Sequence, residues 1–323
     1  MNLFFSICSN NYLAQATVLR NSIKKFNPEI PFFLFLCDQK IPGMNYSPIA
    51  DEVIELESIE PDFNRLALKY NIIELNTCLK PRAFEYLFLE RKCQQAVYLD
   101  PDIQLFHSLA NLFTDYPTMN ILLTPHIYTP IPDDGKTPAE QSFLIFGIYN
   151  LGFISVRHAE ESMACLAWWK NRTYTLGYID TYKGLFVDQL PMNQAPLFFK
   201  NIYLLQDLGM NMAPWNLHER VLDFREARYF VNQSEPLKCY HFSSFKTGQT
   251  ELPLHHYNRF RLDERRDLQK IYTNYQEEIL AAGYKEFSAI KNSYESMRKH
   301  HLSKIKKRQW IKKILPSTFF YSF

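Results

Sequence analysis

The stretch Met1-Asn2-Leu3-Phe4-Phe5-Ser6-Ile7-Cys8 opens the chain, and a similar apolar run, Phe32-Phe33-Leu34-Phe35-Leu36-Cys37, follows after one helix length. Both runs have the length of buried strands. Residues 12–26 between them carry apolar side chains nearer to helical spacing, and Pro28 and Pro31 would end such a helix. The beginning of the chain therefore predicts a β-α-β unit, in which a helix joins two parallel strands.

The same alternation continues along the chain. Further strands are predicted at residues 96–99, 120–124, 149–156 and 202–205, and helices at residues 60–69, 72–79, 81–90, 158–174 and 185–193. Strands that alternate with helices favour a mostly parallel sheet covered by helices, so the predicted fold class is α/β. Ligands of such sheets bind beyond the carboxyl ends of the strands, and Asp100 lies at one of these ends.

Composition and spacing exclude several classes of protein and site. The chain has nine glycines in 323 residues and contains neither G-x-G-x-x-G nor G-x-x-x-x-G-K-[ST], so nothing supports a Rossmann dinucleotide site or a P-loop. No apolar run reaches the ~20 residues that a membrane span needs, and the first residues lack the basic region of a signal peptide. The six cysteines form no C-x-x-C pair, so we expect reduced, mostly buried thiols in a cytosolic protein.

The segment Tyr98-Leu99-Asp100-Pro101-Asp102-Ile103 carries the most informative chemistry, because an apolar strand runs into two carboxylates. In an extended chain residues i and i+2 project to the same side, so Asp100 and Asp102 would face one way. Two such carboxylates form a hard-oxygen site for Mg²⁺ or Mn²⁺. An acidic turn without a ligand is the alternative, since Asp and Pro both favour turns.

Five further segments, one before residues 98–103 and four after them, occur in a recognisable order along the chain. They are residues 4–12, 150–153, 186–189, 215–220 and 240–245. With this ordered set, the chain from about Met1 to Gly248 resembles a bacterial glycosyltransferase of the GT-A fold, close in layout to the retaining family 8 enzymes that include glycogenin and the lipooligosaccharide galactosyltransferases. The resemblance implies a mostly parallel α/β sheet, a nucleotide-sugar donor and a divalent metal cofactor.

The resemblance assigns the nucleotide base and ribose to the polar exit of the opening strand, which here is Ser9, Asn10, Asn11 and Tyr12. A polar loop that caps the following helix explains the same residues and is compatible with that role. Lys80 sits where similar enzymes often place a basic residue that faces the nucleotide-sugar, with Arg82 as the substitute. A lysine on the protein surface is the alternative for Lys80.

The resemblance also implies that Asp100 and Asp102 bind the metal and that His241 is the third protein ligand. An imidazole beside two carboxylates suits Mn²⁺ somewhat better than Mg²⁺. A buried structural histidine is the alternative. Family 8 enzymes usually continue after this histidine with a glycine and Lys-Pro-Trp, whereas Phe242-Ser243-Ser244-Phe245 follows here, which puts a phosphate-binding role for Lys246 in doubt.

Three further residues, Asn150, Asp188 and Gln189, match the positions that line the donor-sugar pocket of similar enzymes, so they are the expected catalytic residues. Asn150 is polar within an apolar segment and needs a partner if it is buried, and a sugar hydroxyl would serve. Gln189 would lie near the anomeric carbon. A strand-end turn for Asn150 and a helix N-terminal charge for Asp188 are the structural alternatives.

The expected activity is transfer of a sugar from a nucleotide-diphosphate donor, with UDP as the implied nucleotide and retention as the implied stereochemistry. The expected acceptor is a saccharide or lipid-linked saccharide in surface polysaccharide or lipooligosaccharide synthesis. A protein acceptor and a catalytically inactive sugar-binding or scaffold protein are the alternatives. A sugar-1-phosphate nucleotidyltransferase is disfavoured because its Gly-rich opening is missing from this sequence. A glycosidase is disfavoured because its two carboxylates stand about 5–9.5 Å apart across a sugar, whereas Asp100 and Asp102 are separated by one residue and suit a metal better.

Basic residues concentrate near the C-terminal end of the sequence. Eight of the 36 Lys and Arg residues lie between Arg298 and Lys313, and no Asp or Glu follows Glu295. We expect a catalytic domain at 1–260 and a helical basic extension at 261–323, in which residues 288–315 lie on an anionic membrane surface. The enzyme would then be cytoplasmic and peripheral on the inner face of the cytoplasmic membrane. A helix packed on the body, or one that binds nucleic acid, is the alternative, and no nucleic-acid partner is expected.

Overall fold

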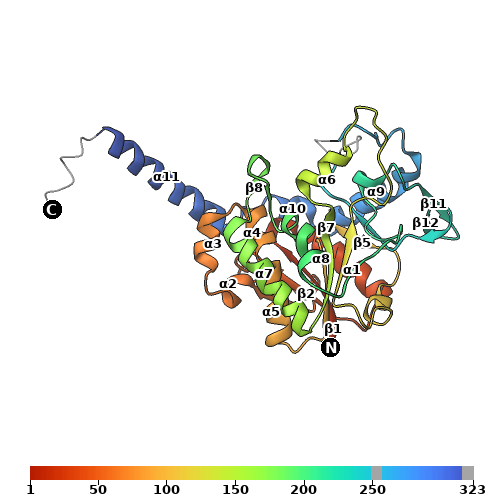
Figure 1. Cartoon of the computed structure of the whole chain (residues 1–323), viewed down its shortest axis with the longest axis horizontal. Helices are drawn as coiled ribbons and strands as arrows, with labels where there is room; N and C mark the ends of the chain where they lie inside the picture. Colours follow the sequence, from red (N-terminus) through yellow and green to blue (C-terminus); the bar gives the residue numbers. More distant parts are fainter. Residues whose placement is uncertain (249–256, 315–323) are drawn as a thin grey trace.

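A seven-stranded sheet forms the centre of the computed structural model, which describes residues 1–248 and 257–314 (Figure 1). The strand order is β10-β6-β7-β4-β1-β2-β3. The strands are β1 (Asn2–Cys8), β2 (Phe32–Leu36), β3 (Glu52–Glu55), β4 (Gln95–Leu99), β6 (Ile121–Pro125), β7 (Tyr149–Arg157) and β10 (Ile202–Leu204). Only β7 among these strands is antiparallel to its neighbours, β4 and β6. The predicted α/β class with a mostly parallel sheet is confirmed.

Strands β1 and β2 are buried on both faces, which is why their sequences are mostly apolar and do not alternate between apolar and polar residues. Successive side chains of β1 enter two different cores. Leu3, Phe5 and Ile7 lie in the core on one face of the sheet, and Phe4 and Cys8 lie in the core on the other. The opening stretch of the sequence therefore holds the two layers of helices together.

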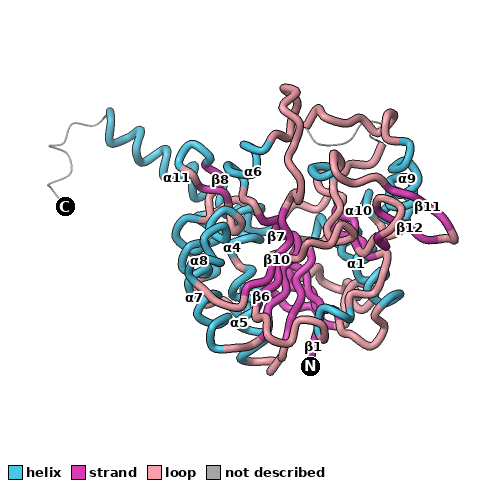
Figure 2. Tube along the Cα trace, turned by 45° about the vertical axis from the view of Figure 1, so that its right-hand side comes forward, coloured by secondary structure: helices cyan, strands magenta, loops and turns pink. Residues whose placement is uncertain are grey.

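Helices cover both faces of the sheet, as Figure 2 shows. They are α1 (Leu13–Phe26), α2 (Leu56–Ile59), α3 (Phe63–Lys69), α4 (Ile72–Cys78), α5 (Lys80–Leu89), α6 (Glu140–Phe146), α7 (Glu160–Leu176), α8 (Ala195–Phe198), α9 (Arg266–Ala281), α10 (Tyr284–Ser288) and α11 (Ser293–Ile314). Short 3₁₀ helices occur at Asn10–Tyr12, Ala110–Phe113, Thr181–Lys183, Leu190–Gln194 and Pro214–Asn216. Helices α4, α5 and α7 pack on one face of the sheet, and α1 packs on the other.

The start of α4 is fixed by a capping box. Asn71 Oδ1 accepts the backbone N–H groups of Ile73 and Glu74, both at 3.0 Å, while the Glu74 carboxylate accepts the N–H of Asn71 at 2.9 Å. Such a cap is worth ~1 kcal/mol of helix stability. It sets the position of α4, which packs against β1 and forms one wall of the site described below.

Smaller strand pairs lie outside the central sheet. Strand β5 (Ile103–Leu105) pairs in antiparallel fashion with β14 (Cys239–His241), and β8 (Ile179–Asp180) pairs with β9 (Leu185–Phe186). A three-stranded sheet consists of β11 (Leu222–Arg225), β12 (Arg228–Val231) and β13 (Glu235–Pro236). The pairing of β5 with β14 matters most, because it brings residues 103 and 241 opposite each other.

The C-terminal helices begin by packing on the body of the molecule. In α9, the Tyr275 ring stacks on Phe242 with a centroid separation of 3.7 Å, and both lie in a core shared with β11 and β12. The start of α11 is also anchored, because Asn292 donates to the Cys37 carbonyl and Tyr294 donates to Glu57. Beyond this anchor α11 leaves the body (Figure 1). The domain boundary at residue 260 stays a prediction. Helix α9 follows this boundary in the sequence but packs on the residues that precede it.

None of the helices in residues 1–248 and 257–314 is long and apolar enough to cross a lipid bilayer.

The helix predicted at residues 185–193 is wrong. These residues form β9, a short turn and the 3₁₀ helix Leu190–Gln194. Val187 has a φ of 39°, outside the helical range, and Pro191 has no N–H to donate within a longer helix. Strands β3, β5 and β14 and the β11–β12 hairpin were not predicted, because runs of three or four residues are too short for a periodicity to be recognised.

Candidate active site

A turn after β4 places the two carboxylates. The N–H of Asp100 still donates to the Gly152 carbonyl at 2.8 Å, and the N–H of Ile103 then donates back to the Asp100 carbonyl at 3.0 Å. Asp100, Pro101 and Asp102 therefore form a turn and not the extended segment that the sequence argument assumed. The prediction that both carboxylates face one site is confirmed in outcome, but the turn and not the alternation of a strand produces it.

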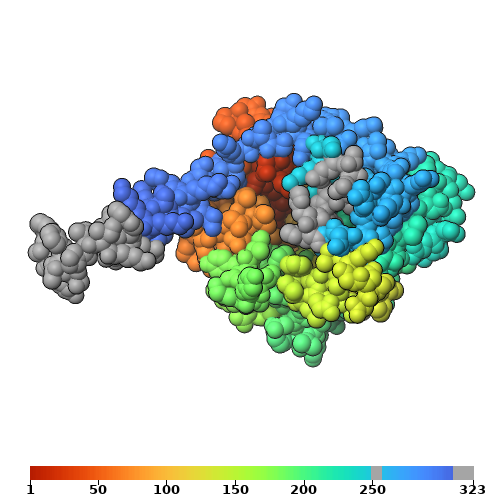
Figure 3. Space-filling model, turned by 90° about the horizontal axis from the view of Figure 1, so that it is seen from above, coloured from red at the N-terminus to blue at the C-terminus, as the bar shows by residue number. Residues whose placement is uncertain are grey.

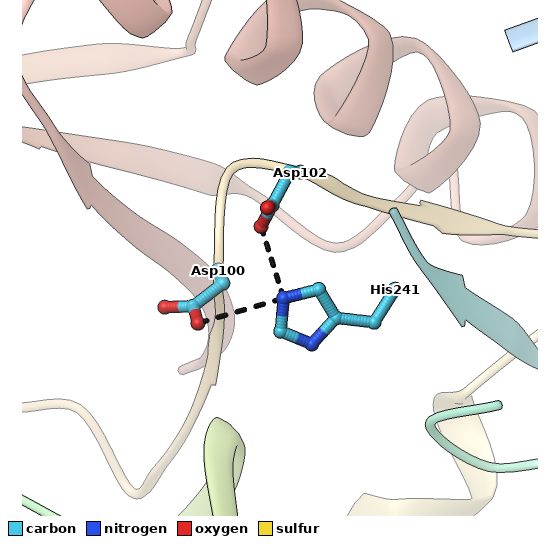
Figure 4. A group of neighbouring side chains, drawn as sticks. All are labelled: Asp100, Asp102 and His241. Atoms are coloured by element: carbon cyan, nitrogen blue, oxygen red, sulfur yellow. Dashed lines mark ion pairs between the residues drawn. The ribbon is translucent and has the colours of Figure 1, made fainter. Parts of the chain in front are cut away.

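His241 reaches the carboxylates from β14, because the strand register places it opposite Ile103. Its Nε2 atom lies 3.1 Å from Asp102 Oδ1 and 3.8 Å from Asp100 Oδ2 (Figure 4). One ligand atom from each of the three residues lies within 4.8 Å of the others. The chain thus brings the predicted metal-binding set together from two separate segments.

The chemistry of this set fits a divalent cation such as Mn²⁺ or Mg²⁺. His241 is buried, whereas the Asp100 and Asp102 side chains are 27% and 19% exposed, so the carboxylates remain accessible. Burial lowers the pKa of the His241 imidazole, but the Asp102 and Asp100 carboxylates together outweigh burial, so the pKa is raised. The carboxylates therefore favour positive charge at the very place where a cation would lie.

A cavity of about 270 Å³ opens beside the carboxylates. Its walls come from the exit of β1, from α4, from the turn at residues 100–102 and from Ser243 and Ser244. Figure 3 shows the molecule hollowed here, with the red N-terminal segment at the floor. The cavity lies at the carboxyl ends of β1 and β4, where ligands of parallel sheets bind.

The four residues predicted to hold the nucleotide divide into two kinds. Ser9, Asn11 and Tyr12 line the cavity, whereas Asn10 does not. The Asn10 side chain donates to the Gln39 carbonyl and accepts from the Tyr46 hydroxyl, so its contacts are structural. The Asn11 side chain makes no hydrogen bond with any described residue, and the Tyr12 ring is exposed. The structure therefore leaves Asn11 and Tyr12 available to a ligand.

Lys80 lies at the centre of a buried charge network. Its Nζ atom is 3.0 Å from Asp188 Oδ2 and 3.6 Å from Asp100 Oδ1, and it donates to the Leu151 carbonyl at 2.9 Å. The Lys80 and Asp188 side chains are only 3% and 2% exposed. Burial lowers the pKa of Lys80, but Asp100 and Asp188 outweigh it, so the pKa is raised and the ammonium stays charged. A lysine on the surface is thereby excluded.

Arg82 points elsewhere. Its guanidinium donates to the Ile59 carbonyl at 2.6 Å and lies 3.5 Å from Glu60. Arg82 does not reach the cavity, because the described lining of the cavity contains neither Arg82 nor its partners Ile59 and Glu60. Lys80 contacts Asp100 beside the cavity but is not in its described lining either, so a contact of Lys80 with the nucleotide-sugar stays a prediction.

Asn150 and Gln189 support β7 beside the metal set. Asn150 Oδ1 accepts the N–H of Gly152 at 3.1 Å, and its Nδ2 donates to His126 Nε2 at 3.2 Å. Gln189 Oε1 accepts the N–H of Leu151 at 3.1 Å, and its Nε2 donates to the Phe146 carbonyl at 2.8 Å. Both side chains are buried and have protein partners, and their contact with a sugar stays a prediction.

Tyr98 and His126 are site residues that the sequence did not single out. The Tyr98 hydroxyl donates to Asp100 Oδ1 at 2.5 Å and its ring lies 4.4 Å from Lys80 Nζ. Tyr98 lies near the end of β4 and precedes Asp100 by two positions, and this short sequence spacing is the signal that could have found it. His126, in contrast, comes from a loop beyond β6 and packs with Trp215, whose ring also contacts His241.

Gly152 provides a direct test of the site's geometry. A Cβ atom at this position would lie 2.5 Å from His241 Cε1 and 2.8 Å from both Asn150 Oδ1 and Asp100 Oδ2. We expect Gly152→Ala to push the metal set apart, to weaken Mn²⁺ binding at least tenfold and to cost about 1–3 kcal/mol of stability. Calorimetric titration and urea unfolding measure the two effects. Wild-type Mn²⁺ affinity in this variant would show that the three ligands are not where we place them.

The burial of His126 predicts that the folded protein loses stability at acid pH. Burial lowers the pKa of its imidazole to about 3, against ~6.5 in an unfolded chain. The native state then keeps His126 neutral while the unfolded state takes up a proton, so stability is intact above pH ~6.5 and falls below it. At pH 5 the loss is about 2 kcal/mol.

Urea unfolding at pH 7.5 and 5.0 measures this loss. His126→Gln should lose about 2 kcal/mol less than the wild type between these two values, whatever its stability at pH 7.5. An equal loss in both proteins would contradict a neutral, buried His126.

Comparison with known proteins gives similarity but no family match. No protein-family model matches the chain. The uncharacterised protein YfnF of Bacillus subtilis is 24% identical over 277 residues, which is 78% of this chain and 88% of YfnF. The galactosyltransferase LgtC, solved with donor and acceptor sugar analogues, is 14% identical with a TM-score of 0.49, over 87% of this chain and 96% of LgtC. Mouse xyloside xylosyltransferase 1 is 12% identical with a TM-score of 0.45, over 75% of this chain and 97% of the mouse protein. Both solved structures are glycosyltransferases.

Proposed function

We propose that the chain is a metal-dependent glycosyltransferase that moves a sugar from a nucleotide-diphosphate donor to a saccharide or lipid-linked saccharide. One observation carries the proposal: Asp100, Asp102 and His241 converge beside a cavity at the carboxyl edge of the sheet. Two carboxylates and an imidazole, left partly open, suit a cation that must also meet the oxygens of a diphosphate.

Asp100, Asp102 and His241 would hold Mn²⁺ or Mg²⁺. Such an ion, when bound, neutralises the diphosphate and so favours departure of the nucleoside diphosphate. The protein prepares these ligands in advance, because Tyr98 and Lys80 both contact Asp100 Oδ1 and leave Oδ2 directed toward His241. Positioning of this kind is where most of the rate of such an enzyme would come from.

The cavity would hold the base and ribose of the donor. Asn11 offers an amide without a partner among the described residues, Tyr12 an exposed ring, and α4 adds the polar side chains of Asn76 and Thr77. These groups suit a flat base and a ribose hydroxyl. UDP is our proposed nucleotide, and retention our proposed stereochemistry, both from the family resemblance of the sequence.

Asp188, Asn150 and Gln189 would define the sugar side of the site. Lys80 joins Asp188 to Asp100, and the amides of Asn150 and Gln189 fix the backbone of β7 at Gly152 and Leu151. The three residues lie beside the metal set, and the described lining of the nucleotide cavity contains none of them. A sugar placed there would meet a preorganised polar surface.

A donor screen tests the proposal. The full-length chain is incubated with UDP-, GDP-, ADP- and TDP-sugars with Mn²⁺, and release of nucleoside diphosphate is measured. We expect release from at least one donor, and its loss on addition of EDTA. Release that continues unchanged in EDTA would contradict a metal-dependent transferase. So would a chain that neither turns over nor binds any of the four nucleoside diphosphates.

We also propose that α11 lies on an anionic membrane surface, which would place the enzyme at the inner face of the cytoplasmic membrane, beside a lipid-linked acceptor. In support, α11 leaves the body (Figure 1), and Met297 and Ile305 are exposed on it. Lys304, Lys306 and Lys307 are exposed as well. The apolar residues Trp310, Ile311, Ile314 and Leu315 also belong to the segment expected on the membrane, and they lie outside the described side chains.

Vesicle flotation measures this binding. Each basic residue near an anionic surface is worth ~1 kcal/mol, so removing three charges should weaken binding roughly 100-fold. We expect the wild type to float with phosphatidylserine vesicles at low salt, and Lys304→Gln/Lys306→Gln/Lys307→Gln to stay in solution. Equal flotation of the two proteins, or none by the wild type, would contradict the membrane role.

A further inference from the structure

A second cavity, of about 630 Å³, lies on the side of the molecule where α1, α9 and the β11–β12 hairpin meet (Figure 1). Its volume falls in the ~300–1,000 Å³ range of small-molecule sites. None of the residues that line the first cavity lines this one. The two cavities are therefore separate, although Gln104 and Leu105 of the second belong to β5, the strand that follows the turn with Asp102.

Three cations from three different elements face this second cavity. They are Lys25 of α1, Arg228 of β12 and Lys270 of α9. None of the three forms an ion pair with a described carboxylate. Glu278 is the one carboxylate in the lining, and it accepts a hydrogen bond from Gln104 at 2.9 Å. The balance of charge at this cavity favours an anionic ligand.

Aromatic rings form the wall behind the cations. Lys270 Nζ lies 3.4 Å from the centroid of the Phe224 ring, which in turn packs at 4.8 Å against Tyr229. A cation held on an aromatic face keeps the rest of its N–H groups free for a further partner. The wall therefore combines flat apolar surface with ammonium donors.

Tyr229 also lines the cavity, although its hydroxyl is covered by the protein and does not face the cavity. The residue is about nine-tenths buried, and its hydroxyl has no hydrogen-bond partner among the described residues. A buried polar group without a partner costs about 1–3 kcal/mol. The amide side chains of Asn21 and Asn274, on α1 and α9, also line the cavity and make no hydrogen bond with a described residue.

We propose that this cavity binds an anionic saccharide, a sugar that carries a phosphate or carboxylate group. The three cations would bind the anionic group, the two amides would bind sugar hydroxyls, and the aromatic wall would cover one face of the ring. A concave site of this size suits one or two sugar units better than a nucleic-acid duplex or a flat membrane. The site goes beyond the proposed transferase, since it shares no residue with the metal set.

The test is equilibrium binding of defined probes to the full-length chain, without donor or divalent metal, so that its result does not depend on the transferase proposal. The probes are glucuronate, glucose 6-phosphate, methyl glucoside and inorganic phosphate, titrated by calorimetry or NMR. We expect glucuronate or glucose 6-phosphate to bind at least tenfold more tightly than methyl glucoside and inorganic phosphate. The proposal is overturned if methyl glucoside or inorganic phosphate binds as tightly as the charged sugars. It is also overturned if neither charged sugar binds at a concentration of about 10 mM, roughly the weakest affinity worth measuring.

Variants locate the binding. Arg228→Gln/Lys270→Gln removes two of the cations, and Lys200→Gln/Lys291→Gln removes the same charge from exposed positions outside the cavity. We expect the first variant to bind the charged sugar at least tenfold more weakly and the second to bind as the wild type does. Equal affinity in the wild type and Arg228→Gln/Lys270→Gln, with circular dichroism showing that both are folded, would place the ligand elsewhere.

Discussion

Asp102→Asn is expected to lower the rate of sugar transfer about 100-fold or more. Asp102 Oδ1 is the carboxylate oxygen nearest to His241 Nε2, at 3.1 Å, and the change replaces an anionic ligand by a neutral amide of the same shape. Loss of the outer partners of metal ligands alone costs ~10–100-fold in affinity or activity, so loss of a direct ligand should reach at least the upper end. Steady-state turnover at saturating donor and Mn²⁺ measures the effect.

Asp100→Asn should lose as much activity and some stability as well, because Asp100 also contacts Tyr98 and Lys80. Asp133→Asn is the matched control, since Asp133 is exposed in the loop before α6. It should retain wild-type turnover. If Asp102→Asn transfers sugar within threefold of the wild-type rate, Asp102 is not a ligand of a required ion.

Lys80→Met is expected to lower the free energy of unfolding by about 3–5 kcal/mol. Lys80 and Asp188 are almost fully buried against each other, and removal of the ammonium leaves the Asp188 carboxylate without its counter-charge. An uncompensated buried charge is far more costly than the pair itself is favourable. Urea unfolding at pH 7 measures the loss.

Two further variants separate charge from packing. Lys80→Met/Asp188→Leu removes both charges and should be more stable than Lys80→Met alone. Lys170→Met breaks the more exposed pair with Glu85 and should lose only about 0–1 kcal/mol. A loss below about 1 kcal/mol in Lys80→Met would contradict the buried pair as described.

The parts of the fold that the sequence predicts are its long buried runs. Strands β1 and β2 are mostly apolar segments of seven and five residues, and α1 between them has helical spacing, so length and periodicity agree. Strands β5 and β14 have three residues each. They exist because they pair with each other across the chain, and no local pattern records a long-range pairing.

The candidate site divides in the same way. Asp100 and Asp102 could be predicted because their sequence spacing is short, although a turn and not an extended strand brings them together. Lys80 pairs with Asp188, whereas Arg82 pairs with Glu60. Both pairings depend on which face of α5 packs against the rest of the protein. Only the tertiary structure decides that orientation, so two basic residues that looked interchangeable in the sequence have different surroundings.

The central claim is that Asp100, Asp102 and His241 hold a divalent ion that couples the protein to a diphosphate. The affinity of the full-length chain for UDP, GDP, ADP and TDP, measured by calorimetry with Mn²⁺ and with EDTA, tests it most directly. We predict that at least one nucleotide binds the wild type tenfold or more tightly with Mn²⁺ than with EDTA, and that Asp102→Asn abolishes this difference. Tight binding that is the same in Mn²⁺ and EDTA, or a Mn²⁺ effect that persists in Asp102→Asn, would contradict the account.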